Sequence, residues 1–331
     1  MTKDKQQIDD KVTLLPHQKI EPIVPKMNRK YRLLCKKVRR KYKKVYISYD
    51  SNNKPSINVV ELMCILIDEL RPAVNSSYCR HVKYEPKNIV RCIIEIINNC
   101  MYWVRYKGIV PGKYLNQCHN NYVKWGVYDC LYLILLEEYL SKDKFGKLKN
   151  QSIDTTFCTN LYGSEMIGRN IKYKSKNGIK ISVKVDKNGV PFSLGIASGN
   201  QNDCIIAKKC HINKSFIDPE SKRVHNSKYQ QKIVADAAYY DKEFHDNIRK
   251  TGCIPIIDVN KRNTKDEEKL KVMEKDKKKY IKEGKNRYIV ESFNSWIHKF
   301  PKITKVVEKS IRSFKGLILL ACSLIISNKI T

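Results

Sequence analysis

The chain has 331 residues, of which 65 are basic and 33 acidic, so its formal net charge is +32 at pH 7. Hydrophobic residues make up 42% of the sequence, which supports a sizeable core and excludes global disorder. A positive excess of this size favours a polyanionic partner, usually nucleic acid, because binding releases counterions. The longest apolar run, residues 316–326, is too short to cross a bilayer, and we find no signal peptide or lipidation motif, so no membrane partner is expected.

The 12 cysteines could indicate disulfides or a zinc site. No two of them have the C-x-x-C spacing, and most lie inside apolar runs. This pattern favours reduced core cysteines in an intracellular protein. Cys204, Cys210 and His211 form a loose cluster, but no second ligand pair follows at a zinc-finger distance.

The N-terminal 50 residues predict a flexible arm followed by a basic helix. Residues 1–26 are polar, contain three prolines and show no periodicity. Between residues 29 and 44 there are ten basic residues and no acid, while apolar residues recur at helical spacing. Because so many like charges lack compensation, we expect this amphipathic helix to contact DNA. The expected contacts are Lys36, Lys37, Arg39 and Arg40.

Residues 51–146 predict a helical domain. Apolar periodicity marks helices over about 57–70, from Pro86 onward, 113–124 and 128–139. Short helices separated by tight turns favour a helix-turn-helix-like DNA-binding domain, although any small helical bundle shows the same pattern.

From residue 147 to residue 331 the pattern changes to that of an α/β domain. Strands are predicted at 152–158, 171–173, 179–185, 192–197, 232–237 and 254–259. A helix at 242–250 lies between the last two strands, and this order favours a β-α-β crossover in a mixed sheet. Residues 262–286 form a charged insertion, and helices at 288–300 and 314–326 close the chain.

Three acidic residues stand out because they lie within apolar segments. Asp154 and Asp236 are placed in or at the end of buried strands, and Glu291 lies on an apolar helix. A buried carboxylate is costly unless it is paired or binds a metal. If the three converge, they form an oxygen-rich site suited to two Mg²⁺ or Mn²⁺ ions. Taken singly, each has a structural alternative: a turn cap or arginine partner for the aspartates, and an ordinary surface position for the glutamate.

The segment from about 153 to 326 resembles the catalytic domain of bacterial insertion-sequence transposases of the IS4/IS5 superfamily, which carry a DDE motif. Three blocks in the family's order carry the resemblance. They are IDTTF (153–157) with GRN (168–170), KNGIKI (176–181) and VDKNGVP (185–191); GNQND (199–203) with VADAAYYD (234–241), GCIPI (252–256) and NKRN (260–263); and RYIVESFN (287–294).

The resemblance implies a ribonuclease H-like mixed sheet flanked by helices, with Asp154 on its first strand, Asp236 on its fourth and Glu291 on the following helix. It implies that these three residues are catalytic and bind two Mg²⁺ or Mn²⁺. It also implies metal-dependent cleavage of DNA at the element's ends, followed by attack of the freed 3′-hydroxyl on target DNA. An N-terminal region with a Trp, a Pro and a Trp-Gly pair belongs to the family; Trp103, Pro111 and Trp125-Gly126 fit it, as they would fit an ordinary aromatic core.

The chain departs from the family's helix signature at two positions. Arg287 and Glu291 match, but Gly284 replaces a tyrosine and His298 replaces a lysine, with Lys299 beside it. We expect Arg287 to contact a phosphate or to orient Glu291. The other expected phosphate contacts are His298, Lys299, Arg169, Lys180 and Arg262. Asp203 is expected to be a helix N-cap rather than a ligand.

The predicted function is therefore that of a transposase. Its expected partners are double-stranded DNA, comprising terminal inverted repeats and target, and a second copy of the chain. We expect it in the cytoplasm with the nucleoid of a bacterium, or inside the host cell of a virus. The alternatives are a catalytically inactive, domesticated DNA-binding protein and a ribonuclease H-like nuclease without strand transfer.

Overall fold

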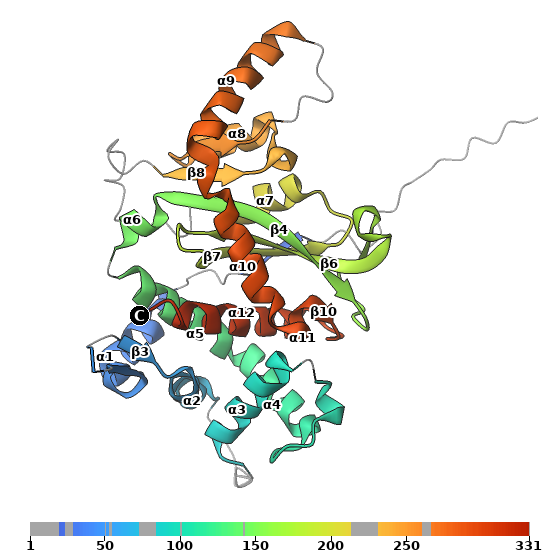
Figure 1. The fold of residues 1–331 in the computed structure, drawn as a ribbon. Helices are drawn as coiled ribbons and strands as arrows, with labels where there is room; N and C mark the ends of the chain where they lie inside the picture. Colours follow the sequence, from blue (N-terminus) through green and yellow to red (C-terminus); the bar gives the residue numbers. More distant parts are fainter. Residues whose placement is uncertain are drawn as a thin grey trace, which may run out of the picture.

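The computed structural model describes residues 20–23, 29–49, 51–52, 55–72, 84–99, 101–141, 143–212, 231–259 and 266–330 (Figure 1). Within these ranges, no helix is both long and apolar enough to cross a membrane. The elements in chain order, with η for 3-10 helices, are β1 (Ile20–Pro22), α1 (Arg29–Tyr46), β2 (Ile47–Tyr49), β3 (Pro55–Ile57), α2 (Val59–Leu70), α3 (Pro86–Asn98), η1 (Trp103–Arg105), α4 (Gly112–Trp125), α5 (Val127–Leu140), α6 (Lys144–Leu148), β4 (Asn150–Asn160), β5 (Gly168–Asn170), η2 (Ile171–Tyr173), β6 (Lys176–Val185), β7 (Pro191–Ser198), α7 (Asp203–His211), β8 (Lys232–Ala235), η6 (Ala237–Tyr239), α8 (Lys242–Lys250), β9 (Ile254–Ile257), α9 (Glu267–Glu283), η7 (Gly284–Arg287), α10 (Tyr288–His298), α11 (Pro301–Thr304), β10 (Lys305–Val306) and α12 (Ile311–Ser327).

The central sheet is mixed, with the order β1-β7-β6-β4-β8-β9. Strands β4, β6 and β7 pair antiparallel, whereas β8 and β9 run parallel to β4. Helix α8 provides the crossover that two parallel neighbours require. Helices α5 and α10 contact this sheet, while α7 and α8 contribute to a separate apolar cluster with Ile153 and Ile233. This is the ribonuclease H-like fold expected from the sequence.

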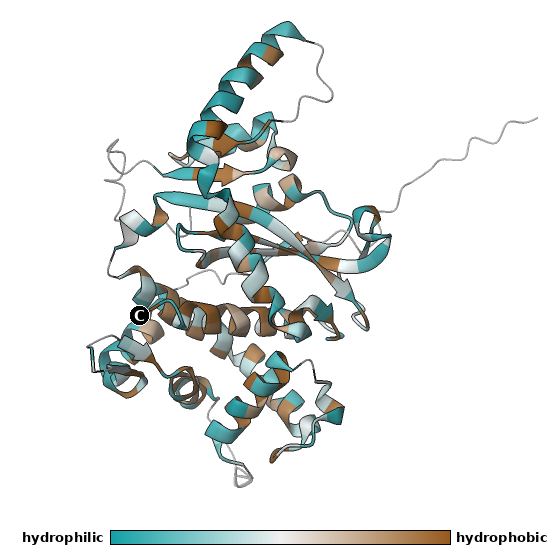
Figure 2. Cartoon of the chain, viewed as in Figure 1, coloured by the Kyte–Doolittle hydropathy of each residue, from teal (hydrophilic) through white to brown (hydrophobic). Residues whose placement is uncertain are grey.

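The helices before the sheet share its main hydrophobic core. Buried residues from α1, α2, α3 and α5 belong to the same cluster as residues of β6, β7 and α12. Helix α12 lies beside α5, and both are largely apolar in Figure 2. The expected boundary at residue 147 is therefore a change of secondary structure, and the hydrophobic core continues across it.

Two short segments differ from the expected secondary structure. Residues 171–173, predicted as a strand, form the 3-10 helix η2, because the Asn170 side chain accepts a hydrogen bond from Lys172 N at 3.0 Å. Lys174 and Ser175 then adopt left-handed backbone conformations, each with φ 55°, and turn the chain into β6. Residues 20–22, predicted within the flexible arm, pair with β7; residues 1–19 lie outside the described part.

The charged insertion contains one long helix. Asp266 caps α9 by accepting hydrogen bonds from Glu268 N and Lys269 N, and the helix extends away from the sheet (Figure 1). It is mostly hydrophilic in Figure 2, and Met273 is its one buried residue among those described.

A buried polar cluster joins the helical region to the end of the chain. Lys302 and Glu308 form an ion pair of 3.1 Å with side-chain exposures of 0% and 6%. The Trp103 indole N–H donates to Glu308 at 2.8 Å, and Ser313 donates to the same carboxylate at 2.6 Å. His119 lies beside them, with Nε2 3.0 Å from Ser313 Oγ and Nδ1 2.9 Å from Tyr128 OH.

The pH dependence of stability should reveal the buried His119. Burial lowers its pKa from 6.5 to about 4, so the folded protein keeps the ring neutral where the unfolded chain binds a proton. Because the unfolded state then binds more protons, stability is lost as pH falls from about 6.5 to 4, by up to about 3 kcal/mol. Urea unfolding of wild type and His119→Gln across this range should show a shallower loss in the variant. Parallel curves would contradict this assignment.

Candidate active site

Asp154 projects from the middle of the sheet toward α10. Alternate residues of a strand face opposite sides, and on β4 Asp154 and Thr156 face α10 while Ile153 belongs to the cluster on the other side. Asp154 Oδ2 accepts a hydrogen bond from Asn294 Nδ2 at 3.0 Å. The pKa of Asp154 is raised to about 6, mainly by burial and also by the negative charges of Asp236 and Asp203, against the lowering effects of Thr155 N–H and Arg287.

Asp236 follows β8, the parallel neighbour of β4. Ser152 is paired with Val234, so continuing that register by two residues brings Asp154 and Asp236 to neighbouring positions. The side chain of Asp236 caps η6 by accepting a hydrogen bond from Ala238 N at 2.8 Å. The negative charge of Asp236 contributes to the raised pKa of Asp154, and a divalent cation would offset this repulsion.

Helix α10 places a polar stripe beside β4. Its apolar residues Val290, Phe293 and Ile297 are buried in the core. A second stripe, spaced by three or four residues, consists of Arg287, Glu291, Asn294 and His298. Asn294 contacts Asp154, and His298 Nε2 lies 2.8 Å from Thr156 Oγ1.

Glu291 is held by its neighbour on the same helix. Arg287 Nη2 lies 2.6 Å from Glu291 Oε1, and the Glu291 side chain is 55% exposed. Among the residues that the structure describes, no three His, Cys, Asp or Glu side chains are placed to hold one metal ion. The structure thus brings Asp154 and Asp236 together and places Glu291 on the adjacent helix, bound to Arg287.

A divalent metal fits this group of residues by two observations. The register places Asp154, in the middle of β4, and Asp236, just after β8, at neighbouring positions of adjacent strands, and carboxylate oxygen is the preferred ligand of Mg²⁺. Asn294 Oδ1 is buried without a hydrogen-bond partner in the described structure, which costs about 1–3 kcal/mol. A divalent cation bound with its water would offset the repulsion between the two carboxylates and could satisfy this acceptor.

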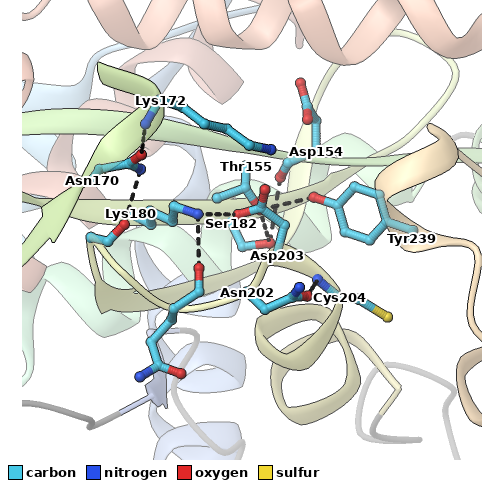
Figure 3. Close-up of polar contacts among 12 residues, drawn as sticks. Asp154, Thr155, Asn170, Lys172, Lys180, Ser182, Asn202, Asp203, Cys204 and Tyr239 are labelled. Carbon is cyan, nitrogen blue, oxygen red and sulfur yellow. Dashed lines mark hydrogen bonds and ion pairs between the residues drawn. The ribbon is translucent and has the colours of Figure 1, made fainter. Parts of the chain in front are cut away.

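The other side of β4 carries a hydrogen-bonded support (Figure 3). Thr155 Oγ1 donates to Ser182 Oγ at 3.0 Å and lies 2.9 Å from Tyr239 OH. Ser182 Oγ is also 3.0 Å from His211 Nε2. This network ties β4, β6, η6 and α7 together behind Asp154, so the strand that carries the carboxylate is fixed from the opposite face.

Several residues expected to contact phosphate have other partners or positions. Lys180 pairs with Asp203 at 2.7 Å and is only 12% exposed, so it does not face solvent as expected. Asp203 is the first residue of α7 rather than its N-cap, because Asn202 accepts the capping bond from Cys204 N. Arg169 and Lys299 are exposed, and Arg262 lies outside the described residues.

The expected DNA-binding helix α1 also uses some of its cations internally. Lys37 pairs with Glu69 at 2.5 Å, and Arg39 lies 3.1 Å from Glu137 and 3.3 Å from Glu138. These pairs attach α1 to α2 and α5. Lys36 and Arg40 are exposed.

Asn294 is the site residue that the sequence reasoning missed. It lies three residues after Glu291, on the polar stripe of α10 rather than the apolar one. That spacing was visible in the sequence, because a polar residue at this position of an apolar helix faces the same way as Glu291.

The fold and the site together are those of a ribonuclease H-like domain. Its acidic residues lie on β4, the first long strand of the sheet, and at the end of β8, the fourth. The family model described as "Transposase DDE domain" matches residues 153–326. This is more than half of the chain, so the chain belongs to the transposase DDE-domain family, and the resemblance drawn from its motifs is confirmed.

A solved structure, "Crystal structure of a pre-cleavage Mos1 transpososome", is similar at 10% identity and a TM-score of 0.22, over 82% of this chain and 85% of that chain. No curated protein matches the chain significantly.

Proposed function

We propose that the protein is an active transposase that cuts DNA at the ends of a mobile element and joins the ends to target DNA, using two Mg²⁺ or Mn²⁺ ions. The observation that carries the proposal is the pair of Asp154 and Asp236 on neighbouring strands, within the family-matched segment and beside the helix of Glu291. Partner and place follow from the reaction: two copies of the chain hold two DNA ends, in the nucleoid if the host is a bacterium.

Asp154, Asp236 and Glu291 would hold the ions in this proposal. When bound, the ions lower the pKa of a water and stabilise the charge on the attacking and leaving oxygens. Arg287 holds the Glu291 carboxylate near the site through an exposed ion pair. Such a pair contributes less than about 1 kcal/mol, so Glu291 could readily exchange Arg287 for a metal ion. The Thr155–Ser182 network holds the strand of Asp154 against movement during the reaction.

A basic segment that packs against β4 is suited to hold the DNA backbone. Between β5 and β6 the exposed cations are Arg169, Lys172, Lys174 and Lys176. The segment is anchored to β4 by Tyr173, whose ring stacks on Phe157 at 4.6 Å between centroids. In the view of Figure 3 the Lys172 side chain extends along the sheet. Phosphate contacts of this kind position the duplex without reading its sequence.

The exposed cations of α1 should contribute to DNA affinity more than the paired ones. Lys36→Ala/Arg40→Ala removes two exposed positive charges, so the slope of log affinity against log salt should fall by about 2. Lys37→Ala/Arg39→Ala is the matched control, because both cations already neutralise glutamates, and its slope should change by less than half as much. Anisotropy titrations with a labelled duplex at several salt concentrations measure both. Equal changes would show that the ion pairs open on binding.

Cleavage of the element's own ends tests the proposed function. The full chain would be incubated with duplexes from the DNA that flanks its gene, in Mg²⁺, in Mn²⁺ and in EDTA. We expect metal-dependent nicks that leave 3′-hydroxyls, and joining of pre-cleaved ends to a plasmid. Binding without cleavage in Mn²⁺ would favour the inactive DNA-binding protein, consistent with Gly284 and His298 in the helix signature. Cleavage without joining would favour a nuclease.

A further inference from the structure

Asn294 on α10 contacts the acidic centre directly. Its Nδ2 donates to Asp154 Oδ2 at 3.0 Å, joining α10 to the middle of β4. A carboxylate can accept this bond but cannot accept one from an amide oxygen, so the ionised Asp154 fixes which way the Asn294 amide points.

The other half of the same amide has no partner. Asn294 Oδ1 is one of the few buried side-chain atoms, among the described residues, that lack a hydrogen bond. A residue placed only to attach the helix to the strand would gain by satisfying both halves of the amide. The structure instead keeps an unsatisfied acceptor next to a carboxylate that lies beside Asp236.

We propose that Asn294 is a positioning residue of the metal centre, which holds the Asp154 carboxylate in the orientation that receives a divalent cation. This inference rests on the proposed function. Nδ2 holds one oxygen of the Asp154 carboxylate, and that fixed carboxylate would supply an oxygen ligand to the cation. Oδ1 would accept a hydrogen bond from a water that enters with the cation.

Binding of Mn²⁺ alone to the full chain tests this role without any measurement of cleavage. Groups that orient a metal ligand typically contribute 10- to 100-fold to metal affinity. Asn294→Ala should therefore weaken Mn²⁺ binding about 10-fold or more, measured by the paramagnetic resonance of free Mn²⁺. Asn120→Ala is the matched control: Asn120 is exposed on α4, and its amide donates to Asn116 O at 2.9 Å. Its Mn²⁺ affinity should equal that of wild type.

Two further measurements separate the outcomes. Thermal unfolding in EDTA shows whether Asn294→Ala is folded; if it is not, Asn294→Ser, which keeps a donor, replaces it with the same expectation of weaker binding. Asp236→Asn sets the scale for loss of a ligand. If Asp236→Asn weakens Mn²⁺ binding and Asn294→Ala leaves it within twofold, the inference about Asn294 is wrong and the metal centre stands. If neither variant changes Mn²⁺ binding, the proposed metal centre itself is overturned, and the inference with it.

Discussion

The Asp236→Asn variant is expected to bind DNA like the wild type and to cleave it roughly a thousandfold more slowly. Asparagine still accepts the hydrogen bond from Ala238 N that caps η6, so the local structure is retained. It lacks the negative charge that would hold the cations. Metal ions contribute several kcal/mol of transition-state stabilisation, and about 4 kcal/mol corresponds to a factor of roughly 10³.

The Asp241→Asn variant is the matched control for this result. Asp241 lies five residues later, caps α8 by accepting a hydrogen bond from Phe244 N at 2.8 Å, and pairs with Lys208 at 2.7 Å. The same substitution there removes an acidic charge and retains a cap, and we expect cleavage within a few-fold of wild type. Initial rates on the flanking-repeat duplex, with anisotropy for binding, measure both variants. Cleavage by Asp236→Asn at the wild-type rate would exclude the proposed centre.

Removal of Glu308 should have the largest effect on stability. Glu308→Ala leaves the fully buried Lys302 without its counter-charge and the Trp103 N–H without its acceptor. Burial alone would raise the pKa of Glu308, but Lys302, Ser313 and His119 outweigh it and hold the pKa below its usual value. Breaking one side of a buried pair typically costs about 3–5 kcal/mol, and we expect a loss of this size in urea unfolding.

Two variants separate the buried charge from a general effect of losing an acid. Asp246→Ala removes half of the exposed pair with Arg249, 3.0 Å apart, and should cost less than about 1 kcal/mol. Lys302→Met/Glu308→Leu replaces the buried pair with apolar side chains and should recover most of the stability lost in Glu308→Ala. A loss under 1 kcal/mol for Glu308→Ala would mean that water reaches Lys302.

Local sequence patterns predicted most of the elements because their causes are local. Alternating or continuous apolar residues marked β4, β6, β7, β8 and β9, and periodicity marked α1 to α5, α8, α10 and α12. The segment 171–173 was misassigned because its conformation depends on one side-chain cap, that of Asn170, and on two left-handed residues after it. Neither the side-chain cap nor the left-handed residues produce a recognisable spacing of apolar residues in the sequence.

The predicted site differs from the observed one where partners are distant in the chain. Asp154 and Asp236 can be identified from the sequence, because a carboxylate inside an apolar strand is costly unless it is paired or binds a metal. The sequence predicts a DNA contact for Lys180, because nothing in its own segment shows that Asp203 lies 2.7 Å away. The same holds for Arg39, whose partners Glu137 and Glu138 lie almost a hundred residues later. Ion pairs between remote segments form only when the tertiary structure brings those segments together, so local sequence patterns do not predict them.

The packing of α12 against α5 has a consequence for any shortened form of the protein. Helix α12 lies near the end of the chain, yet its buried residues belong to the same core as those of the first helices. A premature stop before residue 311 would remove this central helix of the helical layer and expose the apolar residues of α5 to water. An isolated N-terminal fragment would therefore not fold as it does in the intact protein, because it could not complete the core to which its own helices belong.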